Sequence, residues 1–105
     1  MSKPYKQIYH GKNLQKTNKG SKPREWIPNT YIDTYNAYTG RFRSRRKFGK
    51  NGYAKMDMDV GDEHRPYDHV HDYVSNKRNE TPRLPNKKEE VEFRKAKVKR
   101  RFLDD

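Results

Sequence analysis

Three of the four histidines in this 105-residue chain lie within eight positions of one another. They are His64, His69 and His71, and they belong to the one acidic stretch, residues 57–73, of an otherwise basic sequence. Histidine has an ordinary pKa near neutral pH, so its side chain can exchange a proton or bind a metal ion. The density of imidazoles and carboxylates therefore predicts a chemical centre in this stretch.

A spacing of two residues occurs twice in the stretch, in Asp57-x-Asp59 and in His69-x-His71. On a strand, each pair would project from one face, because successive side chains alternate between faces. We expect His69 and His71 to act as general base and acid, with Asp57 or Asp59 orienting one of them and His64 as a further catalytic candidate. This chemistry needs no cofactor. The alternative is a divalent metal held by Asp59, His69 and His71, because imidazole and carboxylate suit Mn, Zn and Ni.

A cationic run lies before the acidic stretch, with five positive charges in residues 41–47. On a strand, alternate arginines would project about 6–7 Å apart, which is close to the phosphate spacing of an extended nucleic-acid strand. Tyrosines nearby could stack on bases. An exposed charged strand that only opposes aggregation is the structural alternative. The residues that we expect to bind nucleic acid, RNA in preference to DNA, are Arg41, Arg43, Arg45, Arg46, Lys47, Tyr67 and Tyr73.

The composition limits both the core and the chemistry. The chain has 26 Lys and Arg against 14 Asp and Glu, a formal net charge of +12, and only 29% hydrophobic residues. A small domain with so few apolar residues has a thin core, and its self-repulsion destabilises the compact state further. The absence of cysteine excludes disulfides and thiolate chemistry. No apolar run has the roughly 18–20 residues that a membrane span needs.

The pattern predicts an α+β fold: a small antiparallel sheet of three or four strands with one C-terminal helix. Residues 1–28 are rich in Lys, Asn and Gly and are expected to form a flexible basic arm, although Trp26 should dock on the core. Residues 29–105 form the single domain. Its strands are expected at 30–35, 41–48, 53–60 and 67–74, and Asn51-Gly52 favours a tight hairpin turn.

Alternation within these segments predicts which side chains share a face. Phe42 and Phe48 should share one face of their strand, and alternate residues 54–60 should share one face of the next. The helix is expected from about Asn86, as its N-cap, to Leu103. Its predicted apolar stripe consists of Val91, Val98 and Phe102.

Part of the sequence resembles a known family. The run 46–60, followed by His64, Pro66 and the segment 68–73, is similar to the C-terminal toxin domains of bacterial polymorphic toxins. The shared order is a basic aromatic strand, a Gly-containing turn, an Asp-x-Asp strand, a His-bearing loop and a His-x-His-Asp-aromatic segment. The resemblance covers about residues 41–74, and the loop 61–65 is more acidic than that pattern.

The resemblance implies a nuclease toxin that acts in the cytoplasm of a competing cell after delivery as part of a larger effector. It also implies neutralisation by a cognate immunity protein, which would be acidic to match the basic chain. The residues that match the toxin pattern are Asp57, Asp59, His64, His69 and His71.

Two further interpretations remain open from the sequence. One is a non-catalytic basic nucleic-acid-binding protein, ribosome-associated or phage-encoded, in which the histidines have no chemical role. The other is a chain that acts only by binding an acidic protein surface, because its charge would speed that association.

Overall fold

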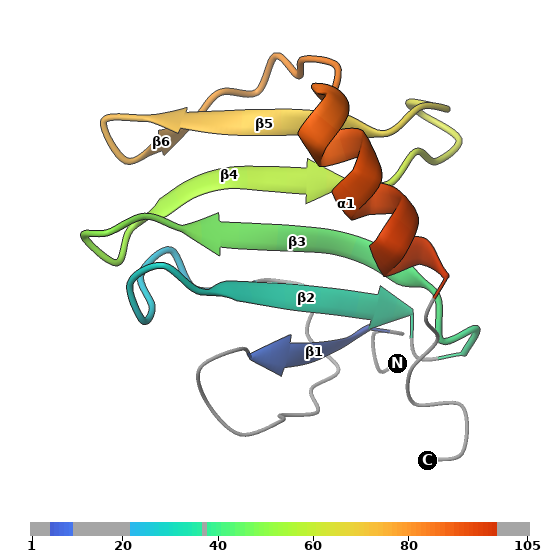
Figure 1. The fold of residues 1–105 in the computed structure, drawn as a ribbon, viewed down its shortest axis with the longest axis horizontal. Helices are drawn as coiled ribbons and strands as arrows, with labels where there is room; N and C mark the ends of the chain where they lie inside the picture. Colours follow the sequence, from blue (N-terminus) through green and yellow to red (C-terminus); the bar gives the residue numbers. More distant parts are fainter. Residues whose placement is uncertain (1–4, 10–21, 37, 99–105) are drawn as a thin grey trace.

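The computed structural model describes residues 5–9, 22–36 and 38–98. Within these residues, six antiparallel strands form one sheet in sequence order, and one helix lies across a face of the sheet (Figure 1). The elements are β1 (Tyr5–Tyr9), β2 (Tyr31–Asn36), β3 (Phe42–Phe48), β4 (Ala54–Asp59), β5 (His69–Val74), β6 (Lys77–Arg78) and α1 (Lys87–Lys97). The predicted α+β class is confirmed, with more strands than the three or four expected.

Part of the expected N-terminal arm is a strand, and parts of both ends of the chain lie outside the described residues. Strand β1 lies in the segment expected to be an arm, and it pairs with β2 along its whole length. Residues 1–4 and 10–21 of that segment, and 99–105 at the end of the predicted helix, lie outside the described residues. No helix in the described part of the chain combines the length and apolar character of a membrane span.

Turn residues at the two central hairpins allow the chain to reverse. The Asn36 side chain accepts hydrogen bonds from the backbone N–H groups of Tyr38 and Thr39. Gly52 ends the Asn-Gly turn between β3 and β4 with a φ of 83°, a value that favours glycine. A Cβ atom at Gly52 would also lie 2.8 Å from the carbonyl oxygen of Trp26. The predicted hairpin turn is therefore confirmed.

The hydrophobic core has two parts, one on each face of the sheet. The first packs the sheet against α1 and consists of Tyr35, Phe42, Met58, Val70, Phe93 and Ala96. The second consists of Ile32, Phe48 and Ala54, against which Trp26 and Tyr73 pack. Full burial of one such large side chain contributes roughly 1.5–3 kcal/mol. Both faces of the sheet are therefore partly apolar, and the docking of Trp26 on the core is confirmed.

Two register shifts change which side chains share a face. Thr34 pairs with Ser44 and Tyr35 pairs with Phe42, so Arg43 is passed over in the β2–β3 ladder. Such a bulge leaves an extra residue on one strand and reverses the alternation beyond it. The prediction that Phe42 and Phe48 share a face is therefore wrong, because they belong to different core clusters.

The second shift passes over Lys55 in the β3–β4 ladder. It separates Ala54, which packs with Ile32 and Phe48, from Met56 and Met58, which pack on the helix side. The prediction of one continuous apolar face along residues 54–60 is therefore wrong at its first residue.

Helix α1 begins with the predicted cap. The Asn86 side chain accepts a hydrogen bond from the N–H of Glu89, and the Glu89 carboxylate accepts one from the N–H of Asn86. This reciprocal arrangement satisfies two N–H groups at the helix start. The predicted stripe is wrong, however: Phe93 and Ala96 face the sheet, whereas Val91 and Val98 are exposed. Phe102 lies outside the described residues.

Candidate functional site

The pairing of β4 with β5 brings the Asp57-x-Asp59 and His69-x-His71 motifs together. Asp57 lies opposite His71, and Asp59 lies opposite His69. Because directly opposed residues point to the same side of a sheet, all four side chains project from one face. Met58 and Val70, which alternate with them, pack towards α1. The site therefore lies on the face that α1 does not cover.

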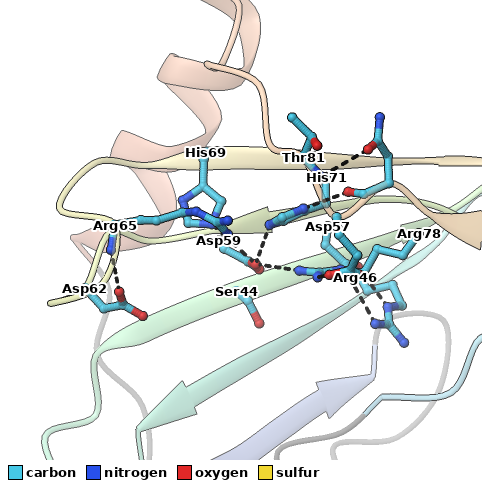
Figure 2. A network of polar contacts seen from close by, with 12 residues as sticks. Ser44, Arg46, Asp57, Asp59, Asp62, Arg65, His69, His71, Arg78 and Thr81 are labelled. Carbon is cyan, nitrogen blue, oxygen red and sulfur yellow. Dashed lines mark hydrogen bonds and ion pairs between the residues drawn. The ribbon is translucent and has the colours of Figure 1, made fainter.

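Two imidazoles converge on one carboxylate (Figure 2). The Nε2 atoms of His69 and His71 lie 3.7 and 3.8 Å from the Oδ2 atom of Asp59. The rings meet edge to face with their centroids 5.1 Å apart. His69 is 5% exposed and His71 is 1% exposed, so their positions are fixed by packing. Asp59, His69 and His71 together form the Asp–His–His cluster.

Backbone carbonyl groups orient both imidazoles. The Nδ1 atom of His69 lies 3.0 Å from the carbonyl oxygen of Tyr67, and that of His71 lies 2.8 Å from the carbonyl oxygen of Asn79. A carbonyl oxygen can only accept a hydrogen bond, so each Nδ1 carries the proton and donates it. In the neutral rings, the two Nε2 atoms therefore direct lone pairs towards Asp59.

Asp57 has a structural role rather than a place in the cluster. It is buried, and its carboxylate accepts hydrogen bonds from Arg46, Arg78 and Tyr73 at 2.8–3.1 Å. Burial alone would raise the pKa of this carboxyl, but the hydrogen bonds and charge of Arg46 outweigh it and lower the pKa. Asp57 is thus an ionised anchor that holds three neighbouring side chains in place.

Arg78 connects this anchor to the cluster. Its Nη2 atom lies 3.0 Å from Asp59 Oδ2, its Nε atom lies 3.0 Å from Asp57 Oδ2, and its Nη1 atom lies 2.8 Å from Glu80 Oε2. The fixed fork of a guanidinium group suits contact with several carboxylates at once. Arg78 therefore restrains the Asp59 carboxylate without filling its remaining lone pairs.

An open pocket of about 280 Å³ gives access to the cluster from one side. The cluster contributes Asp59 and His69 to its wall. The other lining residues, which add hydroxyl groups and charges of both signs, are Thr34, Arg43, Ser44, Val60 and Asp62. The bulge explains two of them, because passing over Arg43 lets neighbouring Arg43 and Ser44 both reach this pocket.

Lys22 contacts two residues of the pocket wall, although its place in the sequence falls in the expected arm. Its Nζ atom donates hydrogen bonds to Thr34 Oγ1 at 3.1 Å and to Ser44 Oγ at 2.6 Å. Burial lowers the pKa of its ammonium group to about 8, against the opposing effect of Asp57. One lysine in a Lys-rich segment gives no sequence signal for such a position, so sequence reasoning missed it, as it missed Ser44 and Arg78.

The residues expected to bind nucleic acid divide between the two faces. Arg45 and Lys47 lie on the helix side, where Glu92 pairs with both and Asp33 with Arg45. Arg46 lies on the site face but is held by Asp57. Arg43 lines the pocket, 3.8 Å from Asp62, and Arg41 is exposed close by. The structure therefore places Arg43 at the pocket beside the cluster and directs Arg45 and Lys47 to the opposite face.

The remaining predicted residues lie near the cluster but outside it. His64 is exposed in the loop between β4 and β5, and it is not one of the converging ligand atoms. Tyr67 is 46% exposed, with its ring edge-on to His69 at 5.8 Å. Tyr73 donates its hydroxyl proton to Asp57, and burial and this carboxylate raise the pKa of its phenol to about 12. Tyr67 is thus available to a ligand, whereas the Tyr73 hydroxyl is occupied.

Comparisons with known proteins yielded no match: no family model, no curated protein and no solved structure is significantly similar to this chain.

Proposed function

We propose that this protein cleaves phosphodiester bonds in nucleic acid, with RNA as the expected substrate. The observation that carries the proposal is the convergence of two buried, oriented imidazoles on Asp59 at the wall of an open pocket. Basic nitrogen atoms held in one orientation can activate an attacking hydroxyl group or water, directly or through a bound ion. Arg43, at the same pocket, would bind the negatively charged phosphate.

The surroundings of the cluster support a substrate that is large and anionic. Arg43 and Arg41 lie along one edge of the site, and the exposed ring of Tyr67 lies beside His69. Aromatic rings of this kind stack on unpaired bases, and arginines bind the backbone. A single-stranded region of RNA, whose bases are free to stack, suits this combination better than a regular duplex.

The proposal is tested with total RNA and a labelled oligonucleotide. Asp59→Asn keeps the size of the side chain, and His71→Ala removes one imidazole; each should lower cleavage by about 10²–10⁴-fold. His64→Ala is the matched control, because it removes an exposed imidazole outside the cluster, and it should retain activity. Circular dichroism must show that each variant is folded. Binding of RNA by the parent protein without any cleavage would reject the nuclease and favour a non-catalytic binding protein.

On the sequence resemblance, we also propose that this nuclease is the toxin domain of a larger interbacterial effector, which acts in the cytoplasm of the target cell. An acidic immunity protein would be its partner, because the net charge of +12 favours association with an acidic surface. Expression of the chain should arrest bacterial growth, and coexpression of the product of the adjacent gene should restore it. Normal growth with a cleavage-competent protein in the cytoplasm would reject the toxin assignment.

A further inference from the structure

The three inward-facing atoms of the Asp–His–His cluster leave a gap of distinctive size. Each Nε2 atom is 3.7 or 3.8 Å from Asp59 Oδ2, and the three ligand atoms lie within 4.8 Å of one another. Separations above 3.5 Å are too long for hydrogen bonds. A divalent transition-metal ion at about 2.0–2.2 Å from each ligand atom holds these atoms roughly 3–4 Å apart. Two of the three separations match this range and the third is at most 4.8 Å, so the three atoms surround a space close to the size of one ion.

The hydrogen bonds behind the histidines are those that a metal site requires. Histidines that bind metals almost always donate their other N–H group to a carboxylate, carbonyl group or water, which fixes the ring and its tautomer. His69 and His71 both do so, through the carbonyl groups of Tyr67 and Asn79. Among the described residues, Asp59 is the acidic group that lies within ion-pair range of both Nε2 atoms. Two nearly inaccessible basic atoms thus point into the same gap.

Asp59 can still act as a ligand while Arg78 holds it. Arg78 contacts the Oδ2 atom at 3.0 Å, and an ionised carboxylate has about four positions for donors or ions. The positive charge of Arg78 is shared with Asp57 and Glu80, which reduces its repulsion of a bound cation. Arg78 therefore corresponds to the outer partner that orients a ligating carboxylate.

Convergence on a single point favours an ion over a separate acid and base. In phosphoryl transfer, the attacking and leaving oxygens lie on opposite sides of phosphorus, so a base and an acid would have to reach two separate places. Both Nε2 atoms instead face the same oxygen of Asp59. Three protein ligands beside an open pocket, which leaves positions for water or substrate, are typical of catalytic metal sites.

We infer that Asp59, His69 and His71 bind one divalent transition-metal ion. Two imidazole nitrogens and one carboxylate oxygen suit zinc, manganese, cobalt or nickel, and they suit calcium poorly. The ion would polarise a phosphoryl oxygen or activate water for the cleavage proposed above, and this catalytic role rests on the proposed function. Metal binding itself does not rest on it.

The test is a titration of the purified, metal-free protein with cobalt(II), followed by its visible absorption, and with zinc(II), followed by calorimetry. The parent protein and His64→Ala should each bind one ion per chain. Asp59→Asn and His71→Gln should bind at least about 10-fold more weakly, because even outer-shell changes at metal sites cost 10–100-fold in affinity. Circular dichroism with added metal shows whether each variant is folded, and the near-isosteric Asp59→Asn keeps the test decisive if His71→Gln unfolds.

Two results would overturn the inference: no saturable binding by the parent protein, or equal binding by the parent and the folded Asp59→Asn variant. RNA cleavage by the same samples, with and without EDTA, separates this inference from the proposed function. Cleavage that persists in EDTA, without metal binding, would reject the metal site and retain the nuclease. One ion bound through Asp59 without any cleavage would retain the metal site and reject the nuclease.

Discussion

Asp57 provides the most specific stability prediction, because a buried carboxylate there anchors three other side chains. It is 3% exposed, and it accepts two hydrogen bonds from Arg46 and one each from Arg78 and Tyr73. Asp57→Asn keeps the volume but removes the charge and replaces one acceptor oxygen with a donor NH₂ group. The two guanidinium groups then face a neutral side chain, and one of their N–H groups faces another donor.

The expected cost is about 3–5 kcal/mol, the usual effect of removing one partner from a buried ion pair. Domains of this size have a total stability of roughly 5–15 kcal/mol, so the change removes a large part of it. Urea unfolding followed by circular dichroism measures the loss as a lower transition midpoint at similar slope. Because Arg78 also restrains Asp59, we expect metal affinity to fall in the same variant.

The matched control is Glu80→Gln, which removes another carboxylate that pairs with Arg78. The Glu80 side chain is 75% exposed, and exposed pairs contribute about 0–1 kcal/mol, so its unfolding free energy should change little. An Asp57→Asn variant within about 1 kcal/mol of the parent would refute the role of Asp57 as an anchor. A loss of several kcal/mol in Glu80→Gln would refute the distinction between the buried and exposed pairs.

Three further predictions concern the pocket and its loop. The pKa of Lys22 is lowered from 10.5 to about 8 in the folded chain, so between these pH values the unfolded chain binds one more proton and the free energy of unfolding rises with pH. In Lys22→Met, urea unfolding from pH 8 to 10 should show this rise reduced by up to about 1.4 kcal/mol per pH unit. An unchanged dependence of the unfolding free energy on pH would contradict the burial of the ammonium group. Arg43→Ala should weaken RNA binding and reduce the slope of the logarithm of the binding constant against log[salt] by about 0.7, because one phosphate contact is lost. Lys50→Ala, in the exposed β3–β4 turn, should do neither, and equal effects of the two substitutions would argue against a specific role for Arg43. Gly61→Ala would place a Cβ atom 2.6 Å from the backbone nitrogen of Tyr67, so the loop whose Tyr67 carbonyl group orients His69 must move. Both the melting temperature and the rate of RNA cleavage should fall. Unchanged values of both would show that the loop tolerates the added methyl group.

Much of the sheet could be predicted from local pattern. The turn at Gly52 and the alternating segments of β2 to β5 follow from glycine conformation and period-two side-chain alternation. The two bulges could not be predicted, because the residues passed over, Arg43 and Lys55, are polar residues that each follow an apolar one, as the regular period-two pattern also requires. A single bulge reverses the alternation, so the predicted faces failed at Phe42 and Ala54 although the strands were located correctly.

The site could be predicted in part, because its ligands lie in two short motifs on consecutive strands. Spacing alone placed Asp59, His69 and His71 on common faces, but their convergence depends on the β4–β5 register, which a nine-residue loop leaves undetermined. The same limit hid the difference between Asp57, held by Arg46, and Asp59, which faces the imidazoles. The ion pairs of Arg45 and Lys47 with Glu92 could not be predicted either, because the side-chain pattern of β3 does not indicate which helix residue will pack against it.

The most direct measurement of the central claim is long-range ¹H–¹⁵N NMR of the histidine rings, before and after addition of one equivalent of zinc(II). We predict that His69 and His71 carry the proton on Nδ1 in the free protein, and that zinc shifts the Nε2 resonances of both rings while the His64 ring stays unchanged. Protonation of either ring on Nε2 instead of Nδ1, or rings of His69 and His71 that do not respond to zinc, would contradict the claim that these atoms form one metal-binding centre.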